Sequence, residues 1–177
     1  MGLMAMAALA AGLPAAAQAV TSATGTQSVT ADVNNTLEAT FPGAYAWGSL
    51  DAGATGNTSS AQTVNVKSNA TWGVKASTDQ VGGQMKEWTG SAYVTVSPQT
   101  LANALSWRLS TLGGVTQPTS FAAFTSTPAL VTGSQSITSD AGIDVGLTYK
   151  QVISYADVNA GSHDYRALVS FDVAQGY

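Results

Sequence analysis

Alternation between apolar and polar residues, with a period of two, is the feature that most constrains the fold of this chain. Val64 and Val66 flank a polar residue, and the same alternation runs from Ile143 to Tyr155 and from Tyr165 to Val173. In a β-strand this pattern places one row of side chains in a core and the other row in solvent. The pattern therefore predicts a chain made of β-strands, each with one buried face.

Turn-forming residues such as Gly82-Gly83 and Gly113-Gly114 separate the alternating runs. Only the segment from Pro98 to Leu105 has helical spacing, and we interpret it as one short turn that leads into a strand. Many strands with frequent turns indicate an all-β fold, and we predict a single antiparallel β-sandwich, immunoglobulin-like or Greek-key, from about Thr24 to Val173. The expected strands contain Val29, Ala31 and Val33; Leu37, Ala39 and Phe41; Val64 and Val66; Trp72, Val74 and Ala76; Tyr93 to Val96; Leu105, Trp107 and Leu109; Ile143 to Tyr155; and Tyr165 to Val173.

Two long polar segments are expected to be surface loops. The first, residues 51–60, is rich in Ser, Gly and Thr, and too few residues precede it to form a separate domain. The second, residues 113–136, contains Phe121 and Phe124. Because long loops are usually functional or mobile, we expect these two rings to pin the second segment to the fold.

The first residues have the pattern of an export signal rather than of folded protein. Met1 to Ala19 carries no charge and ends in Ala17-Gln18-Ala19, the A-x-A pattern that a signal peptidase accepts. The alternative is an Ala-rich helix that breaks at Gly12-Leu13-Pro14. Because the apolar part is shorter than the roughly 20 residues that span a bilayer, we expect no transmembrane segment. We predict a signal peptide at 1–19, one domain at 20–177, and a secreted, extracellular or cell-surface location.

Composition excludes several functional classes. Six Lys and Arg residues against ten Asp and Glu residues give a net charge of −4, so no basic face is expected for nucleic acid. The chain has no Cys and one His, which excludes disulfides, thiol catalysis and Cys-based zinc sites. We therefore predict that the protein is held together by its core alone.

No set of residues has the arrangement that catalysis needs. A Ser-His-Asp triad must use His163, which falls in a turn, and no G-x-S-x-G motif is present. The only glutamates, Glu38 and Glu87, and the aspartates offer no preferred pair for a glycosidase. Asp157 and Asn159 share the beginning of a calcium loop but lack its other ligands, so a turn is the preferred interpretation. We predict no enzymatic activity, no catalytic residues, no metal ligands and no cofactor.

The C-terminal region is predicted to form a long hairpin. A strand that ends at Tyr155 and a strand that starts at Tyr165 are joined by a turn that contains Gly161. A tyrosine at this position is typical of the tyrosine corner, in which the hydroxyl binds a backbone group upstream. The alternative is an ordinary strand tyrosine.

A family resemblance covers residues 60–175. The segment Asn69-Ala70-Thr71-Trp72-Gly73-Val74, the turn Ala160-Gly161 and the strand from Tyr165 to Phe171 resemble secreted bacterial surface domains of the WxL-like, immunoglobulin-like type. One W-x-L is present, Trp107-Arg108-Leu109, and Phe171-Asp172-Val173 stands where a second copy is expected. The resemblance implies export and an immunoglobulin-like β-sandwich, and no binding residue is carried over from it. A cell-wall or glycan surface is considered as a partner separately from the resemblance.

Aromatic residues give the one candidate ligand site. Trp72 and Trp107 are in phase with apolar neighbours and are expected in the core. Tyr45, Trp47 and Trp88 lie near Gly-rich turns, where exposed rings can stack on sugar rings. The alternative is that these three rings close the ends of the β-sandwich.

The expected function is that of a secreted or cell-surface, non-enzymatic structural or adhesive protein of a bacterial envelope. One alternative is a carbohydrate-binding module that uses Tyr45, Trp47 and Trp88. Another is a subunit of an extracellular filament, in which the extended N-terminal arm, Val20 to Val33, adds a strand to the sheet of a neighbouring copy. The sequence leaves these alternatives open.

Overall fold

A computed structural model describes residues 27–53 and 55–177 of the chain. The expected signal peptide lies outside the described residues. The chain divides into two compact units, residues 1–33 and 34–177, and each is described by itself.

The first unit does not form the strand that its alternation predicts. Its described residues, 27–33, have no regular secondary structure, and Val29 and Val33 are each 83% exposed. A strand at 29–33 is therefore wrong, and the first strand among the described residues begins at Leu37. Alternation alone is not sufficient, because a strand needs a neighbour for its backbone hydrogen bonds and residues 27–33 have none in the described part of the chain.

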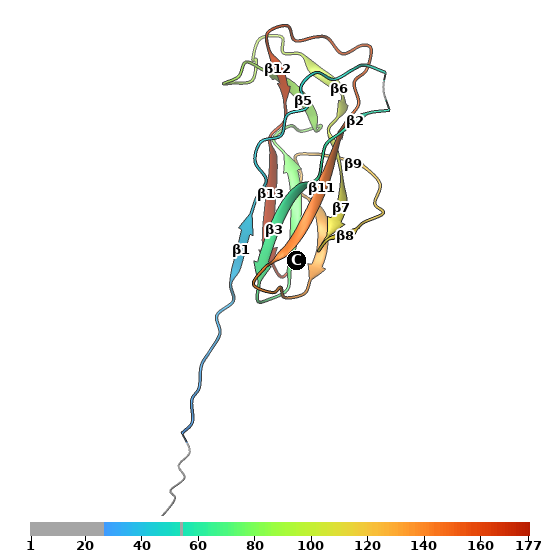
Figure 1. Cartoon of the computed structure of the whole chain (residues 1–177). Helices are drawn as coiled ribbons and strands as arrows, with labels where there is room; N and C mark the ends of the chain where they lie inside the picture. The colour runs from blue at the N-terminus through green and yellow to red at the C-terminus, as the bar shows by residue number, and fades with distance from the viewer. Residues whose placement is uncertain (1–26, 54) are drawn as a thin grey trace, which may run out of the picture. The chain divides into compact units, whose positions relative to one another are not determined.

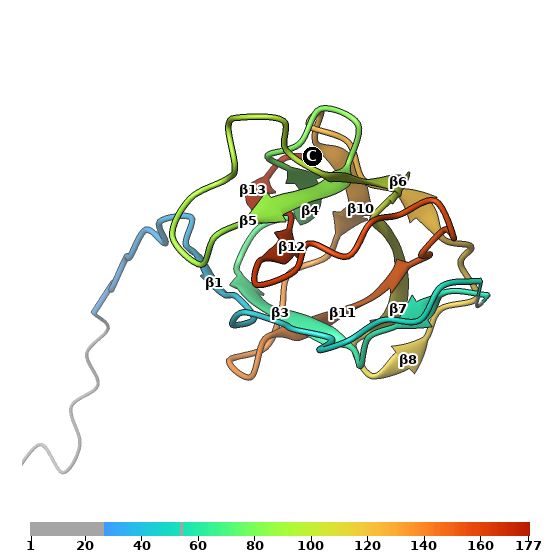
Figure 2. The same cartoon turned by 90° about the horizontal axis from the view of Figure 1, so that it is seen from above.

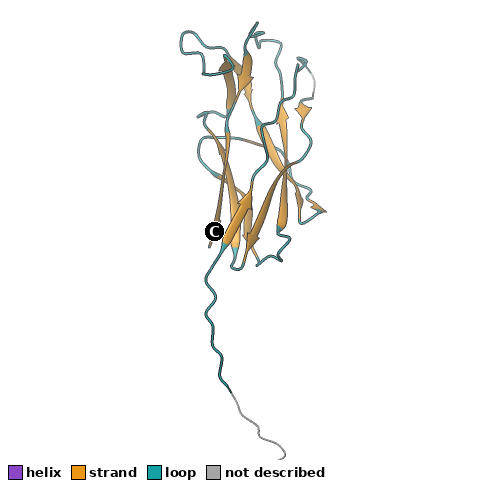
Figure 3. Cartoon of the chain, turned by 60° about the vertical axis from the view of Figure 1, so that its left-hand side comes forward, coloured by secondary structure: helices purple, strands orange, loops and turns teal. Residues whose placement is uncertain are grey.

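The second unit is all-β, and its described residues contain no helix (Figure 3). The predicted all-β class is confirmed. The described part of the chain therefore has no apolar helix that could span a membrane. The strands are β1 (Leu37–Thr40), β2 (Asn57–Thr58), β3 (Gln62–Ser68), β4 (Trp72–Thr78), β5 (Gln84–Trp88), β6 (Thr100–Ala104), β7 (Ser106–Leu112), β8 (Val115–Thr116), β9 (Ala122–Ala123), β10 (Ala129–Gln135), β11 (Ile143–Gln151), β12 (Asp164–Arg166) and β13 (Val169–Gln175).

These strands form three antiparallel sheets. The large sheet has the order β1–β3–β11–β7–β8, with β2 added to β11 and β9 added to β7. The small sheet has the order β10–β4–β13, and the end sheet has the order β12–β5–β6. The end sheet lies at one end of the unit, at the top in Figure 1. The large and small sheets lie on opposite sides of the interior when the unit is seen from above (Figure 2).

The core is built from the inward rows of the large and small sheets. Trp72 is fully buried and Trp107 is 7% exposed, so both lie in the core as predicted. The expected phase of β3 is also confirmed, because alternate residues of this strand are buried. In β4 and β11 the expected rows are buried as well, but so are Gly73, Gly146 and Thr148 between them. The side chains that are 0% exposed include Val64, Val66, Val145 and Leu147 of the large sheet and Trp72 and Val74 of the small sheet.

The predicted C-terminal hairpin is wrong. β11 pairs with β3 on one side and with β7 on the other, so neither of its edges is free for a further strand. The chain after β11 instead leaves the large sheet, forms β12 beside β5 and then forms β13 beside β4. Two strands that are neighbours in sequence thus belong to different sheets.

Two other local predictions are corrected by strand pairing. The segment from Pro98 to Leu105 contains no helical turn but the strand β6, which pairs with β5. Leu101 and Leu105 are both buried. Residues four apart lie on one face of a strand as well as of a helix, so their spacing did not distinguish the two structures. The strand expected from Tyr93 to Val96 is reduced to one isolated bridge between Tyr93 and Trp88, and Val96 is 81% exposed.

The two expected loops carry more structure than predicted. Residues 51–60 include β2, which pairs with the end of β11, so this segment is not a free surface loop. Residues 113–136 contain β8, β9 and the whole of β10, three strands that the sequence analysis missed. Phe124 is 1% exposed and pins this segment to the core, as expected.

Candidate functional site

A cleft of about 1040 Å³ opens at the end of the second unit that carries the end sheet. The three aromatic residues selected from the sequence, Tyr45, Trp47 and Trp88, all line this cleft. They come from two elements far apart in the chain, the segment after β1 and the end of β5. The remaining walls are formed by β6, β11, β12, β13 and the connection between β11 and β12.

The aromatic rings make contacts that fix their orientation. Tyr45 and Trp47 meet edge to face, with ring centroids 5.1 Å apart and an interplanar angle of 87°. Trp88 meets Tyr93 at 5.0 Å and 72°, and the guanidinium of Arg166 lies 4.1 Å from the centroid of a Trp88 ring. Tyr45 is 36% exposed, whereas Trp47 and Trp88 are half-buried. Tyr45 therefore offers the most accessible ring of the three.

The segment from Pro42 to Leu50 covers one side of the cleft, and every residue in it lines the cleft. Within the described residues, no hydrogen bond from backbone or side chain involves this segment. Trp47 anchors it by packing against the core, and Gly48 adopts a φ of +72° that favours glycine. A segment held by side-chain packing rather than by backbone hydrogen bonds is able to adjust to a bound molecule.

The floor of the cleft consists of its most buried lining residues, Leu101, Leu105 and Tyr149, which are 4%, 3% and 7% exposed. The hydroxyl of Tyr149 has no hydrogen-bond partner among the described residues, and burial raises the pKa of this tyrosine to about 12. The indole Nε1–H of Trp47 is also buried without a described partner. Sequence reasoning placed Tyr149 in an inward row of β11, but nothing in the sequence indicated that a cleft lies above it.

A hydrogen-bonded pair, Glu87 and His163, supports the rim of the cleft. Nδ1 of His163 lies 2.7 Å from Oε1 of Glu87, and Oε2 of Glu87 accepts the backbone N–H of Gln99 at 2.9 Å. The Gln99 amide, together with His163, lowers the pKa of Glu87. The side chain of His163 is 36% exposed, so the residue lies at the surface but is tied to the end sheet.

The connection between β11 and β12 is fixed by side chains that bind its backbone. The hydroxyl of Tyr165 donates to the carbonyl of Val158 at 2.6 Å, which is the contact that a tyrosine corner requires. The Asp157 carboxylate accepts the N–H groups of Ala102 and Ser154, each at 2.7 Å. This part of the cleft wall is therefore rigid, and Asp157 serves the turn as expected.

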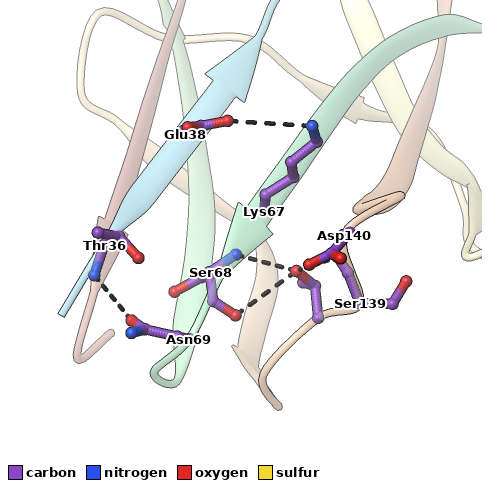
Figure 4. Close-up of a pocket in the computed structure, with 8 residues that line it drawn as sticks. Thr36, Glu38, Lys67, Ser68, Asn69, Ser139 and Asp140 are labelled. Atoms are coloured by element: carbon purple, nitrogen blue, oxygen red, sulfur yellow. Dashed lines mark hydrogen bonds and ion pairs between the residues drawn. The ribbon is translucent and has the colours of Figure 1, made fainter. Parts of the chain in front are cut away.

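A second, smaller pocket of about 390 Å³ lies beside β1 and β3 (Figure 4). Its polar groups bind one another: Nζ of Lys67 lies 3.9 Å from Oε2 of Glu38, and Oδ1 of Asn69 accepts the N–H of Thr36 at 2.7 Å. In the part of the chain that the structure describes, no three His, Cys, Asp or Glu residues come close enough to hold a metal ion. We find no ligand chemistry in this pocket. Its lining residues are Thr36, Glu38, Lys67, Ser68, Asn69, Thr138, Ser139 and Asp140.

Comparisons with protein-family models, with curated proteins and with solved structures found no match to this chain.

Proposed function

We propose that this protein is exported and acts as a non-enzymatic adhesive protein of the bacterial surface, with a glycan bound in the cleft. The observation that carries the proposal is the convergence of Tyr45, Trp47 and Trp88 on one cleft. Each was selected for its position near a turn, and no sequence pattern required them to meet. The leader-like segment Met1 to Ala19 supports the export part of the proposal.

The lining of the cleft suits a saccharide better than other small molecules. A sugar ring has an apolar face that packs on an aromatic ring and hydroxyl edges that need hydrogen bonds. The cleft offers aromatic rings beside a floor with one free hydroxyl, and pockets with a few polar groups on apolar walls are typical binding sites. Asp157 and Asp164 line the cleft together with Arg166, the one arginine among the lining residues, so an uncharged glycan is favoured over an acidic one.

We propose an immunoglobulin-like β-sandwich, similar to the WxL-like surface domains, with the large and small sheets as its two layers. The Tyr165 hydroxyl bond to Val158 supports this assignment, as does the passage of the chain from one sheet to the other after β11. A cell-wall or other glycan surface is the partner that we propose for the cleft.

Binding of the chain to a panel of immobilised glycans tests the proposal. Tyr45→Ala and Trp88→Ala should each weaken retention about tenfold, since a stacked ring contributes on the order of 1 kcal/mol. Tyr155→Ala is the matched control, because Tyr155 is 86% exposed and lies outside the cleft. Failure to retain any glycan, or equal losses in the variant outside the cleft, would overturn the proposal.

Assembly by strand addition is a second candidate, favoured by one observation. Val29 and Val33 belong to an alternating segment, yet each is 83% exposed and neither lies in a strand. Such a row gains apolar burial when it pairs with another copy. Size-exclusion chromatography should then show oligomers that Val29→Ser with Val33→Ser abolishes, and a monomer at all concentrations contradicts this candidate.

A further inference from the structure

The position of the Tyr149 hydroxyl suits a hydrogen bond to a ligand rather than a hydrogen bond within the protein. Tyr149 is 7% exposed, and its hydroxyl has no partner among the described residues. The hydroxyl oxygen is not one of the fully buried polar atoms that lack a partner, so solvent reaches it from the cleft that Tyr149 lines. A molecule that fills the cleft displaces this solvent and must replace it as the hydrogen-bond partner.

Contacts of both its backbone and its ring hold Tyr149 in place. Its backbone N–H donates to the hydroxyl of Ser59 at 2.8 Å, and its carbonyl accepts the Ser59 N–H at 2.9 Å. Its ring packs edge to face against Phe124, with centroids 5.8 Å apart. The hydroxyl is therefore presented to the cleft without any need for rearrangement, which reduces the entropic cost of a contact with a ligand.

The surroundings of this hydroxyl make it selective. The other two floor residues, Leu101 and Leu105, are apolar and cannot replace it as a hydrogen-bond partner. A ligand without an oxygen atom at this point leaves a buried hydroxyl unpaired, and sites of this kind discriminate strongly against analogues that lack one polar group.

We infer that the hydroxyl of Tyr149 determines which saccharides the cleft accepts, by a hydrogen bond to one oxygen of an uncharged sugar ring. The inference rests on the proposed function and names the residue that gives it specificity. Tyr45 and Trp47 supply aromatic rings in the wall of the same cleft, and Tyr149 supplies the hydroxyl. A tyrosine hydroxyl carries its proton at neutral pH, and burial raises the pKa of Tyr149 further, to about 12, so this hydroxyl is able to donate in the hydrogen bond.

Tyr149→Phe tests the inference with the loss of a single oxygen atom. The probes are the neutral tetrasaccharides cellotetraose, xylotetraose, mannotetraose and chitotetraose, measured by calorimetry on the full chain. For the probe that binds best, we expect affinity to fall about tenfold, since a buried donor left unpaired costs 1–3 kcal/mol. The unfolding midpoint should stay unchanged or rise, because the hydroxyl has no partner within the described protein. Tyr155→Phe should change neither quantity.

Monodeoxy versions of the same tetrasaccharide sharpen the test into a double-mutant cycle. One deoxy position should weaken binding to the unmodified protein and cause no further loss in Tyr149→Phe. Unchanged affinity of Tyr149→Phe, or equal losses for every deoxy position in both proteins, overturns the inference and leaves the proposed function standing. No binding of any tetrasaccharide to the unmodified protein, together with no retention on the glycan panel, overturns both.

Discussion

Single buried side chains carry much of the stability of this protein, because it has no cysteine and hence no disulfide. The sequence predicted which of these residues are buried wherever a strand alternates cleanly, as around Val64 and Trp72. It also separated Trp72 and Trp107, which are in phase with apolar neighbours, from Tyr45, Trp47 and Trp88 near turns. It did not reveal Tyr149 as a site residue, because alternation shows that a side chain points inward but not whether a cavity lies above it.

Leu147→Ala should lower the free energy of unfolding by about 3–4 kcal/mol, because it removes apolar burial and leaves a cavity. Leu147 is 0% exposed and lies between β3 and β7 in the large sheet. Leu130→Ala is the matched control, since Leu130 also lies in a strand but is 52% exposed. Its cost should be about 1 kcal/mol or less. Urea denaturation compares the two, and equal losses would contradict the assigned core.

Glu87 should make stability depend on acid pH. The Gln99 amide and His163 hold its pKa below the usual 4.5, so folding favours its ionised form. This contribution is complete above pH 4.5 and is lost as the pH falls through the lowered pKa of the folded protein. Glu87→Gln should therefore be less stable than the unmodified protein at pH 7, and the difference should shrink as the pH falls toward 3.

Glu38→Gln is the control for this pH dependence. The Glu38 side chain is 77% exposed, its contact with Lys67 is 3.9 Å, and an exposed ion pair of this kind stabilises little. Urea midpoints at several pH values should show no difference between Glu38→Gln and the unmodified protein. A Glu87→Gln difference that is independent of pH would contradict the role assigned to the Glu87 pair.

At the scale of elements, local pattern identified most strands but not their ends or neighbours. Where β6 lies, the sequence predicts a helical turn, because leucines four residues apart fit the period of a helix as well as that of a strand. Hydrogen-bonded pairing with β5 makes this segment a strand. The segment 29–33 has the same alternation as β3 but no partner strand among the described residues. The C-terminal hairpin was wrong for a non-local reason, since both edges of β11 are taken by strands that precede it in the chain.

The junction at Gly83, just before β5, should be intolerant of any side chain. Gly83 has a φ of +71°, and a Cβ there would collide with the carbonyl oxygen of Phe124. Gly83→Ala should cost about 3 kcal/mol, from backbone strain and steric overlap together. Gly114 also has a positive φ, +80°, but a Cβ there would meet no other atom. Gly114→Ala therefore adds backbone strain without steric overlap and should lower the free energy of unfolding by about 1 kcal/mol. Thermal unfolding of both variants checks this, and equal midpoints would refute the close approach at Gly83.

At the scale of the whole second unit, three sheets share one interior, and their order depends on contacts between residues far apart in sequence. The alternating pattern predicts an all-β protein, but it does not assign β11 and β13 to different sheets. The cleft could not be predicted from the sequence for the same reason. Its walls come from β5, β6, β11, β12, β13 and the segment 42–50, and these meet only after the sheets have formed.

Engineered disulfides test the sheet order directly in a chain that has no native cysteine. Ser170 of β13 lies opposite Ser77 of β4, so Ser170→Cys with Ser77→Cys should form a disulfide on oxidation. A C-terminal hairpin would instead place Ser170 opposite Lys150. Ser170→Cys with Lys150→Cys should therefore stay reduced, as mass spectrometry after alkylation would show. A disulfide in the second variant and none in the first would contradict the sheet order and support the C-terminal hairpin.

An NMR titration of the chain with neutral tetrasaccharides shows whether the cleft beside the end sheet binds a saccharide. Amide signals from residues 42–50, from residues 157–166 and from the floor of the cleft should shift together with one saturation curve. Signals from the small polar pocket around Glu38, Lys67 and Asp140 should not move. Shifts confined to that pocket, or no shifts with any tetrasaccharide, would show that the cleft does not bind these saccharides.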